Sequence, residues 1–238
     1  MAVTDAPQLQ VQDIHTFIGQ YHILQGVTVD VPRGAITTLL GRNGAGKTTT
    51  LKSILGLTPP RRGRVIFDGV EVQGRPTFEV AALGIGFVPD YRAIFRDLTV
   101  EQNLRIAERK KGDLDRKRGM IFGLFPDLER LIGLRGQQLS GGQQQMLAIA
   151  RALIADNKLL LIDEPTEGLA PVLIEQLMAA IADLSKETTV VLVEQNFTVA
   201  SALAKYYVII EEGRSVKSGL MADLLNDKST IHRYLGAA

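Results

Sequence analysis

The stretch AITTLLGRNGAGKTTTLKSILGL, Ala35 to Leu57, decides the fold. It begins with a short run of apolar and β-branched residues, which predicts a buried strand. A glycine-rich turn follows at once, and a segment typical of a helix follows the turn. The turn, Gly41 to Thr48, fits the pattern G-x-x-x-x-G-K-[ST], in which backbone N–H groups surround a polyphosphate. The stretch therefore predicts a phosphate-binding loop between a strand and a helix of an α/β protein.

Each residue type in this loop has a physical role. Glycine permits the backbone conformations and the close approach that such a loop needs, and the start of the following helix adds a positive dipole end. Lys47 is expected to contact the terminal phosphates, and Thr48 to coordinate magnesium. An ordinary strand–turn–helix connection is the alternative, but the flanking strand and helix favour a nucleotide site. The predicted nucleotide-binding residues are Gly41, Arg42, Asn43, Gly44, Ala45, Gly46, Lys47, Thr48 and Thr49.

A second polar cluster follows the predicted strand in KLLLIDEPTEG, Lys158 to Gly168. Asp163 and Glu164 lie on opposite sides of the strand end, because successive strand residues point in opposite directions. Asp163 is expected to hold magnesium, directly or through water, opposite Thr48. Glu164 is then placed to polarise the attacking water as general base. Alone, such a pair of acids is more often solvated or structural. The phosphate loop favours the catalytic interpretation.

A third element is LSGGQQQ, Leu139 to Gln145, directly before a helical stretch. Ser140 is a candidate N-cap, and Gly141 and Gly142 leave backbone N–H groups bare at a helix start. The set Ser140, Gly141, Gly142 and Gln143 is therefore a second candidate anion receptor. One subunit hardly needs two receptors for one phosphate, so this one is expected to serve a nucleotide on a different subunit. A flexible turn is the alternative for the isolated string.

The order of the predicted elements gives the architecture. Strands and helices alternate in both halves, whereas the residues from Leu98 to about 156 carry only helical periodicity. A helical block inserted into an α/β core is the simplest arrangement. Strands are predicted at 9–14, 26–31, 35–40, 64–69, 84–88, 158–163, 188–193 and 206–213, and helices at 46–57, 99–111, 115–125, 140–156, 171–186 and 197–205.

Composition excludes several classes of protein. The 238 residues carry 27 basic and 26 acidic side chains, so no global field attracts nucleic acid or anionic lipid. There is no cysteine, which excludes disulfides and cysteine-based zinc sites. We see no signal peptide and no apolar run near the ~20 residues that cross a bilayer. A cytoplasmic chain that reaches a membrane only through a partner is expected.

The phosphate loop, then LSGGQ, then LLIDEP, in that order, resembles the ordered motif set of ABC ATPases from about Leu9 to Gly236. The resemblance implies one ABC ATPase domain over 1–238, with an α/β P-loop NTPase core at about 1–90 and 157–238. It also implies an N-terminal antiparallel β region and an inserted helical subdomain at about 91–156. ATP and Mg²⁺ are the implied cofactors.

The resemblance also implies partners and a location. A second, similar ATPase subunit would pack head to tail, with the LSGGQ of each closing on the ATP of the other. Two integral membrane permease subunits and an extracytoplasmic substrate-binding protein would complete the complex, with no nucleic acid. The chain would lie at the cytoplasmic face of the inner membrane, bound through the permease subunits.

Three departures from the common family pattern point to one branch. Gln195 follows the strand TTVVLV at the position where most ABC ATPases have histidine. An acid, Asp90, follows VP, and the loop after DEP contains GLAP. These features resemble the subunits that import hydrophobic, branched-chain amino acids. Close relatives that import urea or short amides are the alternative. A soluble ABC ATPase acting on nucleic acid or ribosomes would need coiled coils, tandem cassettes or a basic surface.

The departures also bear on the site. A glutamine amide can donate to a γ-phosphate oxygen and accept from water, but it cannot titrate near neutral pH. Gln195 is therefore expected to sense the γ-phosphate, with Glu164 as base and Lys47 as the third catalytic residue. Asp90 is expected to act on magnesium through water or to contact a membrane partner, with Arg92 or the ion compensating its charge.

Some positions stay open. The register places Ile18 at or next to the usual adenine-stacking position, with Phe17 and Tyr21 nearby, and selects none of them. The charge run ERKKGDLDRKRG, residues 108–119, is expected to be a solvated helix pair and loop, with a contact to anionic lipid or a partner as the alternative. His15, His22 and His232 have no metal-ligand spacing in the sequence and are expected to be structural.

Overall fold

The computed structural model describes residues 6–236, and its centre is a six-stranded sheet. The strand order is β10-β9-β3-β8-β7-β6. All neighbouring strands are parallel except β9 and β10, which pair antiparallel. The predicted α/β fold is confirmed. The strands are β3 Ile36–Leu40, β6 Ile85–Val88, β7 Leu159–Asp163, β8 Thr189–Val193, β9 Tyr206–Glu211 and β10 Arg214–Leu220.

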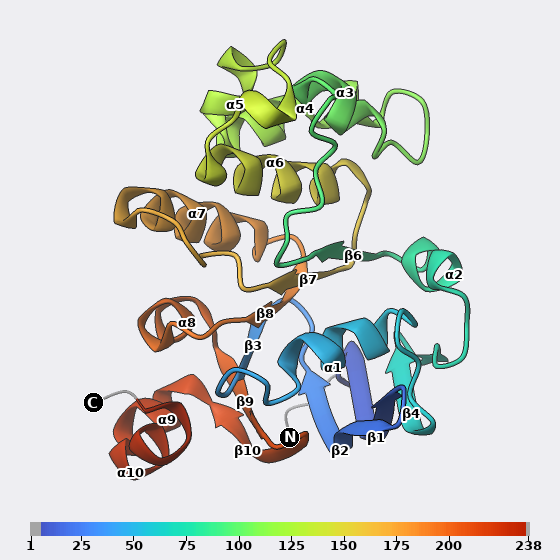
Figure 1. Ribbon diagram of the computed structural model, residues 1–238, viewed down its shortest axis with the longest axis vertical. Helices are drawn as coiled ribbons and strands as arrows, with labels where there is room; N and C mark the ends of the chain where they lie inside the picture. The colour runs from blue at the N-terminus through green and yellow to red at the C-terminus, as the bar shows by residue number, and fades with distance from the viewer. Residues whose placement is uncertain (1–5, 237–238) are drawn as a thin grey trace.

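A second, antiparallel sheet packs beside the first, and helix α1 (Lys47–Ile54) lies between them (Figure 1). Its strand order is β2-β1-β4-β5. The buried side chains Leu51 and Ile54 of α1 share one apolar cluster with residues of both sheets. The helix that follows the phosphate loop is thus held on two sides. The strands are β1 Leu9–Ile18, β2 Tyr21–Val31, β4 Arg62–Phe67 and β5 Val70–Glu71.

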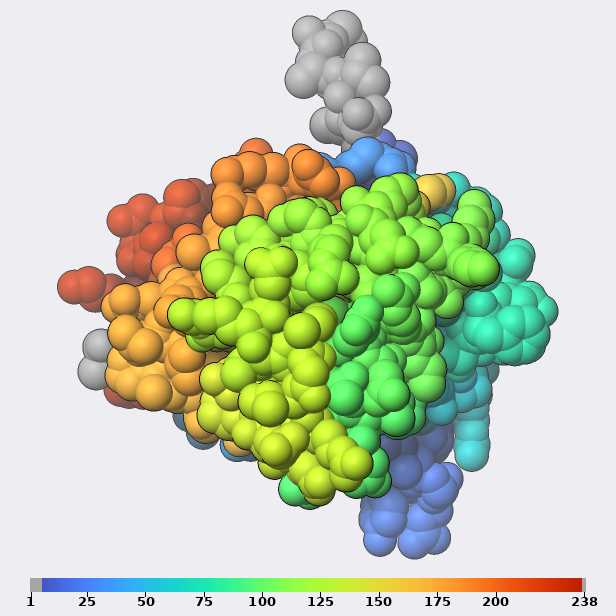
Figure 2. Space-filling model, turned by 90° about the horizontal axis from the view of Figure 1, so that it is seen from above, coloured from blue at the N-terminus to red at the C-terminus, as the bar shows by residue number. Residues whose placement is uncertain are grey.

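The other face of the six-stranded sheet is covered by α6 (Gly141–Ile154) and α7 (Pro171–Leu184), which contribute to a second apolar cluster. Helices α3, α4 and α5 lie on the far side of α6 and form the helical block, which dominates the view in Figure 2. The bounds are α3 Val100–Arg105, α4 Asp113–Leu124 and α5 Pro126–Arg130, with a 3₁₀ turn at Gly136–Gln138. The remaining helices are α2 Thr77–Ala82, α8 Phe197–Leu203, α9 Met221–Asn226 and α10 Lys228–Thr230, followed by a π-helical turn at Ile231–Leu235.

The structure differs from the expected elements in several places, since the short helices α2, α5, α9 and α10 and the strand β5 were not expected. The helix expected over 99–111 ends at Arg105, because the chain then turns around two acids. The Asp113 carboxylate accepts from the backbone N–H groups of Arg109 and Lys110, and Glu108 accepts from that of Leu114. The edge strand β10 was also not expected, because RSVKSGL lacks an apolar face.

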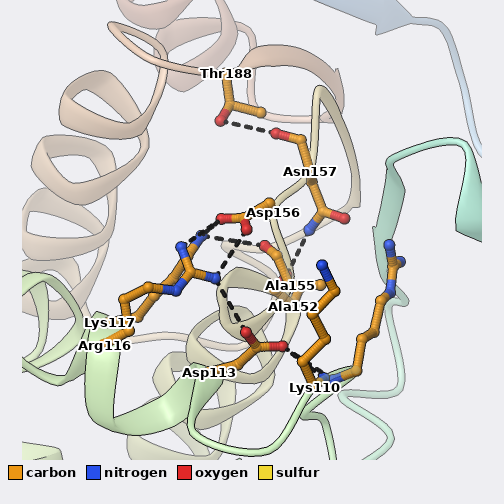
Figure 3. Close-up of polar contacts among 10 residues, drawn as sticks. Lys110, Asp113, Arg116, Lys117, Ala152, Ala155, Asp156, Asn157 and Thr188 are labelled. Carbon is orange, nitrogen blue, oxygen red and sulfur yellow. Dashed lines mark hydrogen bonds and ion pairs between the residues drawn. The ribbon is translucent and has the colours of Figure 1, made fainter.

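The charge run is also less solvated than expected, since part of it forms an ion-pair network (Figure 3). The Arg116 guanidinium donates to Asp113 at 3.0 Å and to Asp156 at 2.8 Å, and the Lys117 ammonium lies 2.7 Å from Asp156. Asp113 is only 9% exposed in its side chain. Asp156 follows α6 and leads into β7, so the network fixes α4 to the segment through which the helical block returns to the sheet.

Candidate functional site

The predicted phosphate loop joins β3 to α1 and lies tightly against neighbouring backbone. At Gly41, with φ 145°, an added Cβ would meet the carbonyl oxygen of Ile210 at 2.2 Å. At Gly46, with φ 112°, it would meet a methyl group of Leu24 at 2.7 Å. Both positions therefore require glycine. Along the loop, Arg42, Asn43 and Gly44 are exposed, Ala45 and Gly46 are buried, and Thr48 and Thr49 are half-buried.

Lys47 is 4% exposed, and its side chain points into the loop and contacts the loop backbone. The ammonium donates to the carbonyl oxygens of Gly41 at 2.9 Å and Arg42 at 3.1 Å. It also lies 3.7 Å from a carboxylate oxygen of Glu164. Burial lowers the pKa of Lys47, against the attraction of Glu164 and Asp163. The cation is thus placed between the loop and the acids that follow β7.

Asp163 and Thr48 meet at the carboxyl ends of β7 and β3. The Thr48 hydroxyl donates to Oδ1 of Asp163 at 3.1 Å. Asp163 is fully buried, and its Oδ2 has no hydrogen-bond partner among residues 6–236. Burial raises the pKa of Asp163 to about 6, against the Thr48 hydrogen bond. A buried carboxylate with a free oxygen beside a hydroxyl is a donor set that suits Mg²⁺.

This donor set is incomplete by itself. In the described part of the chain, no group of three or more His, Cys, Asp or Glu side chains is arranged to hold a metal ion. Mg²⁺ is usually bound by one or two protein oxygens together with substrate phosphates and water. The residues therefore fit an ion that arrives with a nucleotide better than a resident metal.

Glu164 and Gln195 follow the neighbouring strands β7 and β8, and their side chains are in direct contact. The Gln195 amide donates to Glu164 Oε2 at 2.6 Å. Glu164 has φ 44°, a left-handed conformation that non-glycine residues rarely adopt. The parallel sheet explains why the two residues lie together, whereas the hydrogen bond between them was not expected. It orients the carboxylate that lies between Gln195 and Lys47.

Glu194 is a further polar residue here, and no role for it was predicted. Its side chain is buried, and its carboxylate accepts from the Thr166 hydroxyl at 2.7 Å. It also accepts from the backbone N–H groups of Thr166 and Asn196, each at 3.3 Å. Burial raises the pKa of Glu194. Glu194 therefore ties the loop after Glu164 to the end of β8. The only signal in the sequence was its position next to Gln195.

Asp90 lies exposed after β6, where it accepts from the backbone N–H of Tyr91 at 2.9 Å. Its charge is one of the groups that raise the pKa of Asp163, so the two acids are close enough to interact. Arg92 does not pair with Asp90. Its guanidinium instead lies against Gly141, 3.4 Å from the position of an added Cβ.

The LSGGQ stretch lies at the start of α6, away from the phosphate loop. Ser140 is the N-cap of α6 and forms a capping box with Gln143. Gly142 packs against Leu173, which would be 2.3 Å from an added Cβ. Figure 1 shows α6 and α1 on opposite faces of the six-stranded sheet. The two candidate anion receptors of one chain are therefore separated by the sheet.

The adenine-stacking position is expected on the β1–β2 hairpin. The contacts of this hairpin show which of its side chains are available to stack on adenine. Phe17 stacks on His22 with a centroid distance of 4.2 Å, and the Arg61 guanidinium lies 4.4 Å from the Phe17 centroid. Ile18 and Tyr21 are 49% and 67% exposed. Phe17 already contacts His22 and Arg61, so the exposed Ile18 and Tyr21 are the open candidates for stacking.

Comparison with known proteins gives one consistent result. The model of the family described as "ABC transporter" matches residues 24–167. The high-affinity branched-chain amino acid transport ATP-binding protein BraG of Pseudomonas aeruginosa is 39% identical over 231 residues, covering 96% of this chain and 99% of that protein.

Two solved structures extend the likeness to the fold. The ATP binding subunit of an ABC transporter superposes with a TM-score of 0.82 at 28% identity, covering 97% of this chain and 95% of that one. A dimeric ATP-binding cassette in a post-hydrolysis state, bound to ADP and phosphate, superposes with a TM-score of 0.79 at 26% identity, covering 90% and 98%.

Proposed function

The chain belongs to the ABC transporter family, and from this premise we propose that it is the ATP-hydrolysing subunit of an importer for branched-chain amino acids. As a family member it binds ATP and couples ATP hydrolysis to transport. The observation that carries the proposed substrate is the likeness to BraG, which extends over nearly the whole of both chains. The sequence features around Gln195 and the GLAP stretch support the same branch.

In the proposed site, the loop from Gly41 to Thr49 holds the phosphates through its backbone N–H groups and the start of α1. Thr48 and Asp163 hold Mg²⁺ through the hydroxyl and the carboxylate, with Asp90 acting through water. When bound, MgATP supplies the γ-phosphate whose transfer to water is the reaction. Lys47 needs only to turn from the carbonyls of Gly41 and Arg42 toward the phosphates, because its ammonium already lies inside the loop.

Glu164 is proposed as the general base that takes a proton from the attacking water. Gln195 holds its carboxylate at 2.6 Å and supplies a neutral amide toward the γ-phosphate. One carboxylate oxygen of Glu164 must remain available to water. Gln195 contacts only Oε2, so this condition is met. Gln195 cannot compete for the proton, so the acid–base step belongs to Glu164 alone.

The LSGGQ stretch is proposed to complete the site of a second subunit. Ser140, Gly141, Gly142 and Gln143 begin α6, on the face of the sheet opposite α1. A head-to-tail pair of ATPase subunits, similar but distinct chains, would place each stretch over the other's phosphate loop. The dimeric cassette among the similar structures supports the pairing of two ATPase subunits.

We propose that the membrane subunits dock in a groove between the core and the helical block. Among residues 6–236, no helix is long and apolar enough to cross a membrane. The groove encloses about 230 Å³ and is lined by residues of both parts, including Leu57, Phe87, Ala107, Arg109 and Arg151. Leu57 is 52% exposed and Ile106, beside Ala107, is 56% exposed. An apolar segment that carries an acidic side chain would match this lining.

This docking follows the proposed division of the single domain, with the core at about 1–90 and 157–238 and the helical subdomain at about 91–156. The chain would then lie peripherally at the cytoplasmic face of the membrane. An extracytoplasmic binding protein would deliver the amino acid to the permease subunits. The two ATPase subunits would close on ATP and separate after hydrolysis. This movement would change the shape of the groove, because residues of both the core and the helical subdomain line it.

The test is ATP hydrolysis by the assembled transporter in liposomes, with purified binding protein loaded with leucine or with urea. Stimulation by the leucine-loaded protein supports the proposal. Stimulation only by the urea-loaded protein would assign the other importer class.

Two variants separate binding from chemistry in this assay. Glu164→Gln keeps the shape of the side chain but removes the base, so it should bind ATP, hydrolyse it slowly and accumulate as an ATP-stabilised dimer. Lys47→Ala removes the cation that faces the terminal phosphates and should lose tight MgATP binding in a calorimetric titration. Normal turnover by Glu164→Gln would place the base elsewhere.

A further inference from the structure

We propose that His15 and His22 form a binding site for a divalent transition-metal ion of the zinc class, on the β1–β2 hairpin. The two histidines are seven residues apart in the sequence and have no metal-ligand spacing. The structure nevertheless places Nδ1 of His15 3.1 Å from Nε2 of His22. The ion would take both nitrogens, with water in its remaining positions.

The spacing of the two nitrogens matches what one ion requires. At metal–nitrogen distances of about 2.0–2.1 Å, two imidazole nitrogens are about 3.3 Å apart around a tetrahedral ion and about 2.9 Å apart at a right angle. The observed separation lies between these values. An ion can therefore replace the hydrogen bond between the rings with only small movements of either side chain.

The His15 ring is oriented by a bulge in β1. The pairing register between β1 and β2 shifts between Val11 and Ile14, where Asp13 adopts φ 47°. Asp13 Oδ1 then lies 3.5 Å from Nε2 of His15. Gly26 opposite has no side chain, and an added Cβ there would lie 2.8 Å from that oxygen. A carboxylate beside one ring nitrogen favours a proton on that nitrogen, which leaves Nδ1 free to bind a metal.

The His22 ring is held by stacking. It lies against Phe17 with an interplanar angle of 6°, and Arg61 lies over the same aromatic ring. Arg61 therefore adds a second contact to the ring on which His22 stacks. Both imidazoles are thus fixed before an ion arrives, which reduces the ordering cost of binding.

The site is open to solvent and separate from the phosphate loop. The side chain of His15 is 24% exposed, and Figure 2 shows the blue N-terminal strands standing out beyond the helical block. Because only two protein ligands converge here, we expect reversible binding rather than a permanent structural ion. Neutral imidazole is the binding form, so affinity should fall as the pH is lowered.

The experiment is a calorimetric titration of the nucleotide-free full-length chain with Zn²⁺, in a large excess of Mg²⁺ that competes for sites made only of oxygen ligands. One equivalent should bind. His15→Gln and His22→Gln should each abolish that event, and Asp13→Asn should weaken it about 10- to 100-fold by freeing the His15 ring. His232→Gln replaces the only other histidine and should leave it unchanged.

A structural readout makes the result independent of the variants' stability. X-ray absorption spectroscopy at the zinc edge, on the wild-type protein, should show two imidazole nitrogen ligands at about 2.0–2.1 Å from the ion. Binding that survives in His22→Gln, that disappears in His232→Gln, or that shows no imidazole ligands would overturn the proposal. The absence of any saturable Zn²⁺ binding would overturn it as well.

Discussion

At the scale of single residues, the site holds a buried carboxyl group, Asp163, whose ionised form is unfavourable in the folded protein until a ligand binds to it. Asp163 is fully buried, and Thr48 satisfies one of its two oxygens. Its pKa is raised from 3.8 to about 6, so the folded chain without ligands disfavours the ionised form. A cation that binds both Asp163 and a nucleotide would reverse this preference.

Asp163→Asn should therefore stabilise the ligand-free protein at alkaline pH. A raised pKa in the folded state means that the contribution of Asp163 is most favourable below about pH 4 and is lost as the pH rises through about 6. This rise of the pKa from 3.8 to about 6 corresponds to about 3 kcal/mol. Urea unfolding without nucleotide at pH 5 and pH 8 measures it. Stability curves of the two proteins that stay parallel across this range would contradict the expected effect.

Gln195→Ala should slow ATP hydrolysis more than it weakens ATP binding, because the amide orients Glu164. A hydrogen bond to a charged group is worth about 1.5–3 kcal/mol, which corresponds to a rate loss of about ten- to a hundred-and-fifty-fold. The assay requires the assembled transporter. Gln195→His should keep more activity and acquire a pH dependence near neutrality. Full activity of Gln195→Ala would show that Gln195 is needed neither to orient Glu164 nor to sense the γ-phosphate.

At the scale of secondary-structure elements, the sequence predicted the parts of the site that strand ends determine. Asp163, Glu164 and Gln195 each follow an apolar run, and parallel strands bring such ends to one edge. Side-chain directions beyond the strand ends were not predictable. Nothing in the polar triplet after β8 indicated that Glu194 turns inward to Thr166. Likewise, the Arg116–Asp156 pair joins residues 40 apart, so local charge patterning predicted only a solvated run.

Glu194→Ala should slow turnover and lower stability together, because it leaves the buried hydroxyl and N–H of Thr166 without their acceptor. An unsatisfied buried group costs about 1–3 kcal/mol. Glu194→Gln keeps one acceptor oxygen and should recover much of the loss. Thermal unfolding and steady-state ATPase kinetics of the assembled complex measure both effects.

Glu167→Gln is the matched control, since it changes an exposed acid in the same loop. It should leave turnover and stability near those of the parent protein. An equal loss in Glu167→Gln and Glu194→Ala would mean that the charge of the loop, rather than its anchoring, sets the rate.

At the scale of the whole molecule, the proposed docking groove joins the two parts of the domain, while the phosphate loop and LSGGQ stretch lie at α1 and α6. A membrane partner in the groove would touch both parts without covering either anion receptor. Movement of the helical block relative to the core would then directly displace the part of the partner that is bound in the groove.

Leu57→Asp should weaken assembly with the membrane subunits and leave ATP binding by the isolated chain unchanged. Leu57 is 52% exposed, so the substitution should cost little folding stability. Co-purification with the permease subunits and calorimetry with MgATP measure the two properties. Leu225→Asp, at an exposed apolar residue of α9, is the control and should assemble normally. Normal assembly of Leu57→Asp would move the docking surface elsewhere.

The order of the strands determines when the protein can fold during its synthesis. Strand β3 carries the phosphate loop, and its two neighbours in the sheet are β8 and β9. Ile36 pairs with Val190, so a ribosome must add more than a hundred further residues before β3 has any partner in that sheet. A nascent or truncated chain that ends between Glu164 and β8 contains the loop, Asp163 and Glu164 but cannot hold them at one edge. Only a chain whose synthesis has passed β8 can therefore bind nucleotide at this site.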